Sequence, residues 1–327
     1  MDGGDPRDAP AERRVGRRAG SAAALPGRSR SLGAGRVSHD SSEPQLSFSV
    51  PTISPAPRPR RDDAWLVALD VDGTIMTEGG QISDAVADEI TRLRLDGHEV
   101  MIATGRSVAM TLPVIERLGF DSDFVVCSNG AMTLGRDDTS SDGYKTVFVE
   151  EFDPTEVLTT IDGRLEGAGY AVEDAHGNML YLGAFPEIAL TPTSREATFA
   201  ELCGVAATRV VVMSPSHSLD DFLEIVESMG LHKVSYNVGW TAWLDIAPFG
   251  VTKATALERV RTWLDIPAER VMAVGDGRND IDMLTWASRA GRGVAMGQAP
   301  DDVLAVASER TGSDVDDGLA SALATLR

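Results

Sequence analysis

The sequence predicts an α/β protein: a doubly wound parallel sheet interrupted by an inserted α+β domain. Two observations carry this prediction. Short apolar segments of strand length alternate with amphipathic helical segments from Trp65 to about residue 131, and again from Gly250 onward. Between these parts, residues 132–248 mix β-like and helical segments without regular alternation. In a parallel sheet of this kind, ligands bind at the carboxyl ends of the strands.

Chain length and net charge limit the number of domains and the classes of partner that we expect. A chain of 327 residues is too long for one ordinary core, so we expect two domains. Residues 1–61 contain 11 Arg and 6 acidic residues, a net charge of +5, so the rest of the chain carries about -25 and the whole chain -20. So acidic a body is a poor nucleic-acid binder. No apolar run approaches the ~20 residues of a membrane span, and we expect a soluble, cytoplasmic protein.

We expect the chain to divide into a tail at 1–61, a sheet domain formed by 62–131 and 249–327, and an insert at 132–248. The tail is rich in Arg, Ala, Gly, Ser and Pro without hydrophobic periodicity, which predicts disorder. It lacks the apolar segment of a signal peptide. An alternative is that the true start lies downstream.

Cysteine and histidine usage argues against two kinds of site. Cys127 and Cys203 lie far apart in apolar contexts, so we expect reduced core residues and neither a disulfide nor a zinc site. The five histidines are scattered without pairing, which disfavours a histidine-based metal site.

The first part of the sheet domain has clear element signals. Val86, Ile90 and Leu93 recur at helical spacing after the capping residue Ser83, and Gly97 ends the helix. The expected elements in order are a strand at 65–69, this helix, a strand at 100–103, a helix ending at Gly119 and a strand at 124–127.

The remaining elements follow the same signals. In the insert we expect strands at 145–152, 170–172, 209–213, 233–237 and 241–246, and helices at 154–165 and 219–229. After it we expect a helix at 252–264, a strand at 271–274, a helix from 281, a short strand at 294–296 and a helix at about 318–326.

Two aspartates, Asp70 and Asp72, directly follow the first apolar strand and precede Gly73 and Thr74. Two carboxylates ~4 Å apart repel by about 4 kcal/mol at an effective dielectric of ~20. A divalent cation or a retained proton must offset this repulsion. Both suit phosphoryl transfer, in which one carboxylate attacks phosphorus and the other handles a proton. The alternative is a solvated Asp-x-Asp turn.

Two further polar positions could hold a phosphate. The Thr104 hydroxyl and the Gly105 amide lie after a buried strand and could donate to a phosphate oxygen, although Thr104 could equally serve the turn. Lys253, one of only three lysines, lies in the first turn of a helix, where the dipole disfavours a cation. This conflict indicates a nearby anion; the alternative is a solvated lysine.

A third cluster follows the strand at 271–274. Asp276 could reach a metal shared with Asp70, Asn279 could bind phosphate, and Asp280 could orient a metal-bound water. A capped helix with acids in its first turn would explain the two aspartates separately, but not their place opposite Asp-x-Asp. Oxygen ligands around a hard cation favour Mg²⁺.

The ordered set of motifs resembles the haloacid dehalogenase (HAD) superfamily, and most closely its Cof-like class IIB phosphatases. The motifs that carry the resemblance are Asp70-Val71-Asp72-Gly73-Thr74, Ala103-Thr104-Gly105-Arg106, Ser128-Asn129-Gly130-Ala131, Leu244-Asp245-Ile246 followed by Gly250-Val251-Thr252-Lys253, Gly275-Asp276-Gly277-Arg278-Asn279-Asp280 and Gly293-Val294-Ala295-Met296-Gly297. The resemblance covers about Trp65 to the end of the chain. One departure is Gln298, where the family usually has Asn, and we expect little consequence.

This resemblance implies a Rossmann-like core, an inserted cap domain that selects the substrate, and Mg²⁺ as cofactor. It implies that Asp70 is the nucleophile and a metal ligand, and that Asp72 is the general acid and base, with its carbonyl on the metal. The remaining roles would be phosphate binding by Thr104, Gly105, Lys253 and Asn279, metal binding by Asp276, and orientation of groups around the metal by Asp280.

The sequence therefore predicts a Mg²⁺-dependent hydrolase of small phosphate monoesters, such as sugar phosphates or phosphorylated cofactors, acting through an aspartyl-phosphate. One alternative is a phosphomannomutase-like phosphosugar mutase, which returns the phosphoryl group to the sugar. A second is an inactive phosphosugar-binding regulator. The expected partner is a small phosphorylated metabolite, with neither nucleic acid nor membrane.

Overall fold

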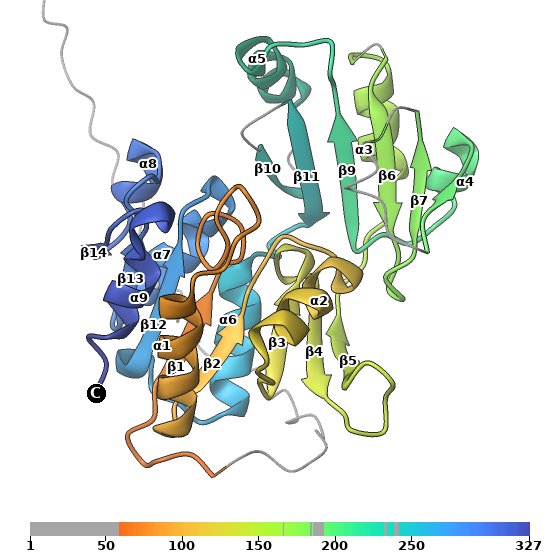
Figure 1. Cartoon of the computed structure of the whole chain (residues 1–327). Helices are drawn as coiled ribbons and strands as arrows, with labels where there is room; N and C mark the ends of the chain where they lie inside the picture. Colours follow the sequence, from red (N-terminus) through yellow and green to blue (C-terminus); the bar gives the residue numbers. More distant parts are fainter. Residues whose placement is uncertain (1–58, 166, 184, 186–192, 232–233, 239–241) are drawn as a thin grey trace, which may run out of the picture. The chain divides into compact units, whose positions relative to one another are not determined.

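The computed structural model describes residues 59–165, 167–183, 185, 193–231, 234–238 and 242–327. These residues form a parallel sheet with helices on both faces and a mainly antiparallel sheet in the insert (Figure 1). Within this part of the chain, no helix combines the length and apolar character that crossing a membrane would require.

The central sheet has five parallel strands in the order β14-β13-β12-β1-β2. A parallel bridge between Ala103 and Val126 brings a sixth strand, β3, to its edge. The bounds are β1 (Leu66–Leu69), β2 (Glu99–Ile102), β3 (Phe124–Cys127), β12 (Val271–Gly275), β13 (Arg292–Ala295) and β14 (Glu309–Arg310). The predicted parallel sheet is confirmed.

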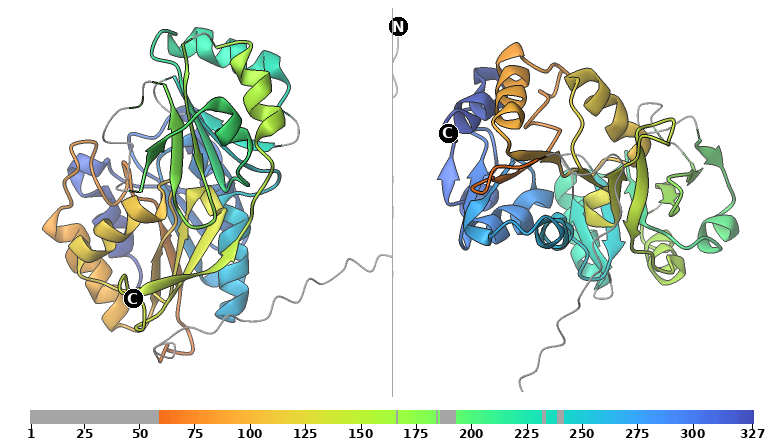
Figure 2. Two further views of the ribbon diagram at one scale, coloured as in Figure 1. Left: turned by 90° about the vertical axis from the view of Figure 1, so that its right-hand side faces the viewer. Right: turned by 90° about the horizontal axis from the view of Figure 1, so that it is seen from below.

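Helices cover both faces of this sheet because the buried strands are apolar on both sides (Figures 1 and 2). Val67 and Leu69 pack in one core cluster, and Leu66 and Ala68 pack in the other. The first cluster receives α1 (Asp84–Leu95), α2 (Val108–Leu118) and α9 (Gly318–Leu323); the second receives α6 (Lys253–Trp263) and α7 (Ile281–Ser288); α8 (Asp301–Leu304) packs in a smaller cluster.

The expected helix ends are present. Ser83 caps α1 by accepting the backbone N–H of Val86 at 3.2 Å. α2 ends at Gly119 in the left-handed conformation, with φ +64°. Thr252 caps α6, so Lys253 is the first residue of that helix.

The hairpin β4 (Met132–Arg136) and β5 (Tyr144–Val149) pairs with β3. Met132 and Leu134 pack in the same core cluster as α1 and α2. This hairpin falls in the range expected for the insert, yet its side chains pack with the sheet domain. We therefore propose that the inserted domain begins near Phe152.

The inserted domain is a six-stranded sheet in the order β10-β11-β9-β6-β7-β8. Its elements are α3 (Thr155–Asp162), β6 (Gly169–Glu173), β7 (Met179–Leu182), β8 (Arg195–Glu196), α4 (Phe199–Cys203), β9 (Arg209–Met213), α5 (Leu219–Met229), β10 (Val234–Val238) and β11 (Trp243–Pro248). The three helices pack on one face of the sheet. The other face carries a small cluster of Ala171, Met179 and Val211.

Several outcomes can be compared with the predictions. The strand at 209–213 and the helix at 219–229 are confirmed to the residue. Cys127 is buried, as expected, whereas Cys203 is only half-buried, and both are free thiols. The predicted starts of two strands, at 233 and 241, and nearly all of the tail lie outside the described residues. The strands β4, β7, β8 and β14 and the helices α4 and α8 were not predicted.

Candidate active site

The site residues lie where strands of the central sheet end. Asp70 directly follows β1, Asp276 directly follows β12, and Thr104 lies two residues past β2. Asn129 follows β3 in the same way. The parallel arrangement brings these carboxyl ends to one edge of the sheet, as the sequence predicted.

Lys253 joins two of the acidic residues. Its Nζ atom donates to Asp70 Oδ1 at 2.7 Å and to Asp280 Oδ1, also at 2.7 Å. The lysine is 1% exposed, so its charge is balanced inside the protein by these carboxylates. The anion that we expected near the N-terminus of this helix is therefore a pair of aspartates.

Asp70, Asp276 and Asp280 each offer a carboxylate oxygen, and these oxygens lie within 4.8 Å of one another. Asp280 is already satisfied, because its Oδ2 accepts the backbone N–H groups of Asp276 at 3.0 Å and Gly277 at 2.9 Å. Because its Oδ1 accepts from Lys253, both carboxylate oxygens of Asp280 are occupied, and Asp280 holds Lys253 in position. Asp70 and Asp276 remain as the carboxylates suited to a metal.

The cluster has more negative than positive charge. Burial raises the pKa of Asp70 well above its usual value, the charge of Asp280 adds to the effect, and Lys253 opposes it. Burial, with Asp280, raises the pKa of Asp276 to about 7. Burial alone would lower the pKa of Lys253, but Asp280 and Asp70 raise it above its usual value. A divalent cation would offset the excess negative charge.

Two glycines allow this close approach. Gly73 has φ +74°, and a Cβ there would lie 2.1 Å from Asp276 Oδ2. A Cβ on Gly275 would lie 2.4 Å from Asp280 Cγ. Any other residue at either position would push an aspartate out of the cluster.

The loop after β2 is tied to the turn after β3. The Thr104 hydroxyl oxygen accepts the N–H of Arg106 at 3.1 Å. Asn129 N donates to the Thr104 carbonyl at 3.0 Å, and Asn129 Oδ1 accepts from Asn279 Nδ2 at 3.1 Å. Ser128 and Asn129 both have positive φ, near +50°, a strained conformation that is common at functional sites.

Asp72 is oriented differently from Asp70. Its side chain is 64% exposed and is held by both nitrogens of the Arg106 fork, at 2.8 Å from Nε and 2.5 Å from Nη2. Arg106 was not among the predicted site residues, although it directly follows Thr104 and Gly105. Its place in that motif was the available signal.

Gln298 contacts the cluster directly. Its Nε2 donates to the Gly73 carbonyl at 2.6 Å and lies 3.3 Å from Asp276 Oδ2, while its Oε1 accepts the N–H of Asp314. The side chain therefore orients Asp276. Spacing alone could not indicate this contact, which joins three loops.

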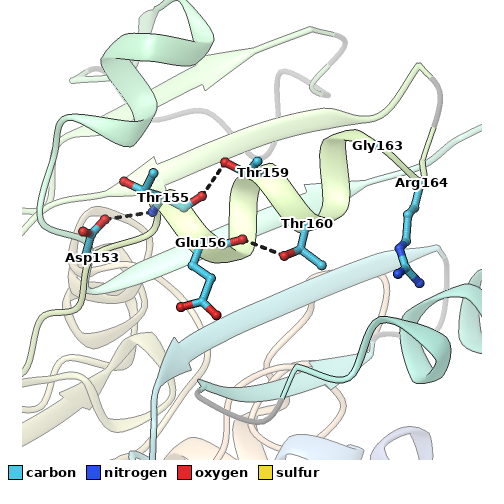
Figure 3. Close-up of a pocket in the computed structure, with 7 residues that line it drawn as sticks. All are labelled: Asp153, Thr155, Glu156, Thr159, Thr160, Gly163 and Arg164. Atoms are coloured by element: carbon cyan, nitrogen blue, oxygen red, sulfur yellow. Dashed lines mark hydrogen bonds between the residues drawn. The ribbon is translucent and has the colours of Figure 1, made fainter.

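A separate groove of about 710 Å³ lies along α3 in the inserted domain (Figure 3). None of the predicted site residues lines it. Several of its polar groups already have partners in the protein. Asp153 accepts the Thr155 N–H at 2.9 Å, and the hydroxyls of Thr159 and Thr160 donate to backbone carbonyls one turn earlier at 2.7 Å. Arg164 donates to the carbonyl of Ser228 at 3.1 Å. This groove therefore carries no ligand assignment.

Curated relatives of the chain are phosphatases by name. It is 26% identical over 269 residues to the Bacillus subtilis 5-amino-6-(5-phospho-D-ribitylamino)uracil phosphatase YitU, covering 78% of this chain and 95% of the relative. It is 29% identical over 280 residues to the Escherichia coli pyridoxal phosphate phosphatase YbhA, covering 78% of this chain and 96% of the relative.

Solved structures share the fold. The HAD subclass IIB sugar phosphatase BT4131 superposes with a TM-score of 0.67 at 22% identity, over 80% of this chain and 98% of that one. The HAD phosphatase BT1666 from Bacteroides thetaiotaomicron has a TM-score of 0.64 at 25% identity, over 83% and 98%. The family model for haloacid dehalogenase-like hydrolases matches residues 67–323. The chain therefore belongs to the haloacid dehalogenase-like hydrolase family.

Proposed function

We propose that this enzyme hydrolyses small phosphate monoesters, with Asp70 as the nucleophile. The observation that carries the proposal is the buried bridge from Lys253 to Asp70 and Asp280, next to Asp276. Lys253 holds the Asp70 carboxylate in place and supplies positive charge where a phosphoryl group would arrive.

The donor set suits Mg²⁺, which prefers carboxylate and carbonyl oxygens. Asp70, Asp276 and the backbone carbonyl of Asp72 would hold the ion, and Gln298 would orient Asp276. When bound, the ion would neutralise charge on the phosphoryl oxygens. Asp280, which is occupied by Lys253 and two backbone amides, would stay outside the ligand set.

The proposed reaction has two steps. An Asp70 oxygen forms a bond to phosphorus as the bond to the alcohol oxygen breaks, and Asp72 gives its proton to the departing alcohol. Water then attacks phosphorus and loses a proton to Asp72, which releases inorganic phosphate and restores Asp70. The Thr104 hydroxyl, the Gly105 amide, Asn279 and Lys253 would bind the phosphoryl oxygens.

The names of the relatives support small phosphorylated metabolites, such as phosphorylated cofactors or polyol and sugar phosphates, as substrates. The inserted domain would then select the substrate and exclude water. The acidic net charge of -20 supports an enzyme that binds neither nucleic acid nor an anionic membrane surface.

The test is turnover of p-nitrophenyl phosphate with Mg²⁺, with EDTA, and in an Asp70→Asn variant. We expect activity only with Mg²⁺ and an intact Asp70, whereas Asp88→Asn, on an exposed site of α1, should behave as wild type. Activity in Asp70→Asn would refute the nucleophile assignment. Incubation with a hexose phosphate separates the alternatives: free phosphate supports hydrolysis, an isomer supports a mutase, and neither product from any substrate supports a regulator.

A further inference from the structure

Three charged side chains gather on the helix-free face of the inserted sheet. They are Glu173 of β6, Arg209 of β9 and Asp245 of β11, on three strands that lie side by side (Figure 1). Glu173 pairs directly with Arg209, and Asp245 pairs with Val211, two positions along from Arg209. Because residues two apart in a strand share a face, all three side chains project from the same face.

The arginine lies between the two acids. Arg209 Nε is 3.2 Å from Glu173 Oε2, and Nη1 is 3.7 Å from Asp245 Oδ1. Glu173 and Arg209 are 1% and 5% exposed. Burial raises the pKa of Glu173 and that of Asp245, and the charge of Arg209 opposes both shifts. Burying charged side chains costs free energy unless their ion pairs and hydrogen bonds have good geometry.

The cluster reaches across to the sheet domain at two points. Arg209 Nη1 donates to the carbonyl oxygen of Gly105, and Ser128 Oγ donates to Glu173 Oε2 at 2.9 Å. These two points lie in loops that are themselves joined, because Ser128 N donates to the Arg106 carbonyl at 2.9 Å. The inserted domain therefore contacts the loop that carries Thr104.

The peptide group between Gly105 and Arg106 is held at both ends. Its carbonyl accepts from Arg209, and its N–H donates to the Thr104 hydroxyl oxygen at 3.1 Å. A hydroxyl that accepts this N–H keeps its own proton available for another acceptor. The orientation of this peptide group therefore determines whether Thr104 presents a donor.

Stability alone does not account for the cluster. Arg209 Nε and Asp245 Oδ1 make the ion-pair contacts given above but no hydrogen bond, and Glu173 Oε1 is buried without a hydrogen-bond partner among the described residues. Buried polar clusters that serve packing usually satisfy such atoms. In this cluster these three atoms make no hydrogen bond, whereas Arg209 Nη1 donates to a backbone carbonyl of the sheet domain.

We propose that Arg209 is a positioning residue, which fixes the loop at 104–106 in its phosphate-binding conformation through the Gly105 carbonyl. This inference rests on the proposed function, because it takes Thr104 and Gly105 as phosphate donors. It follows that the inserted domain contributes to phosphate affinity without touching the phosphate.

The experiment compares Arg209→Met with Arg136→Met. Arg136 is a matched control: it is also buried, lies 2.8 Å from Asp123 and 3.3 Å from Asp121, and is placed at the opposite ends of β3 and β4 from the site. We measure the dissociation constant of inorganic phosphate with Mg²⁺ by calorimetry, and kcat and KM for p-nitrophenyl phosphate. For Arg209→Met, the phosphate dissociation constant and KM should rise together by about tenfold or more, with a smaller change in kcat.

A purely structural role would lower the amount of active enzyme and leave the phosphate dissociation constant unchanged. A change of less than about threefold in that constant, equal to the change in Arg136→Met, would overturn the inference. If Arg209→Met fails to fold, the double variant Glu173→Gln with Arg209→Gln removes both charges together and should show the same loss of phosphate affinity. Wild-type affinity in a folded double variant would equally overturn it.

The same measurements separate the two proposals. If the wild type turns over substrate and Arg209→Met binds phosphate as tightly as Arg136→Met, only the proposed role of Arg209 is refuted. If the wild type neither turns over substrate nor binds phosphate, both the proposed function and the proposed role of Arg209 are refuted.

Discussion

The Nζ atom of Lys253 lies 2.7 Å from Oδ1 of Asp70, although the two residues are 183 positions apart in the chain. The contact joins the end of β1 to the first residue of α6, which begins only after the inserted domain has been completed. The site therefore forms only when both parts of the sheet domain have folded together.

The first prediction concerns this lysine. Lys253→Met leaves three clustered carboxylates without their cation, and removing one partner of a buried pair costs about 3–5 kcal/mol. We expect a lower melting temperature and loss of phosphatase turnover. Lys145→Met is the control, because Lys145 is 44% exposed and pairs with Asp137 at the surface, where ion pairs contribute little to stability. Equal melting temperatures for the two variants would contradict the structural part of this prediction.

The second prediction distinguishes a role of Asp72 in acid catalysis from a role in substrate binding. Asp72→Asn removes the group that would protonate the leaving alcohol, which contributes about 10²–10⁴-fold for a poor leaving group. The loss should be large for glycerol phosphate and much smaller for p-nitrophenyl phosphate, whose leaving group needs little protonation. Asp96→Asn, another arginine-paired surface aspartate, should leave both rates unchanged. A uniform loss on both substrates would argue for a binding role of Asp72.

The third prediction concerns Gln298. We expected that Gln in place of the Asn usual in the family would have little effect on function. Its amide orients Asp276, and groups that orient metal ligands typically affect metal affinity by about 10–100-fold. Gln298→Leu should therefore raise the Mg²⁺ concentration for half-maximal activity by that factor, with little change at saturating Mg²⁺. Gln81→Leu, at an exposed position, is the control. An unchanged Mg²⁺ concentration for half-maximal activity would mean that Gln298 contributes only to packing.

The fourth prediction is a pH dependence of stability. His98 Nδ1 accepts the Trp65 N–H at 3.1 Å, and burial lowers the pKa of His98. Below about pH 6.5 the unfolded chain binds a proton at this histidine more readily than the folded chain does, so the free energy of unfolding should fall as the pH drops below that value. Urea midpoints measured from about pH 7 to pH 5 test this.

Two variants assign that pH dependence. His98→Gln, whose amide oxygen can still accept the Trp65 N–H, should lose this part of the pH slope, and His176→Gln, at an exposed site, should keep it. A wild-type slope in His98→Gln would place the titrating group elsewhere.

The sheet domain could be predicted because its signals are local. The apolar strand before Asp70, the cap at Ser83 and the glycine at 119 each lie within the element that they define. The place of Lys253 at a helix N-terminus indicated an anion nearby, and the structure brings two aspartates to it.

Other features depend on pairing between distant segments. The hairpin of β4 and β5 packs with the sheet domain because it hydrogen-bonds to β3, which no periodicity in its own short strands indicates. Glu173 and Arg209 meet through the register of β6 and β9. The Arg106 fork on Asp72 depends on how two loops approach each other. Such contacts are set by tertiary packing and are not contained in any one motif.

The most direct test of the central claim is to trap the phosphorylated enzyme. Wild-type protein is mixed with substrate and Mg²⁺, quenched with borohydride, and digested for mass spectrometry. Borohydride reduces an acyl phosphate to an alcohol, so the account predicts conversion to homoserine at position 70 and only when substrate is present. An unmodified Asp70 during active turnover, or reduction at a different carboxylate, would contradict it.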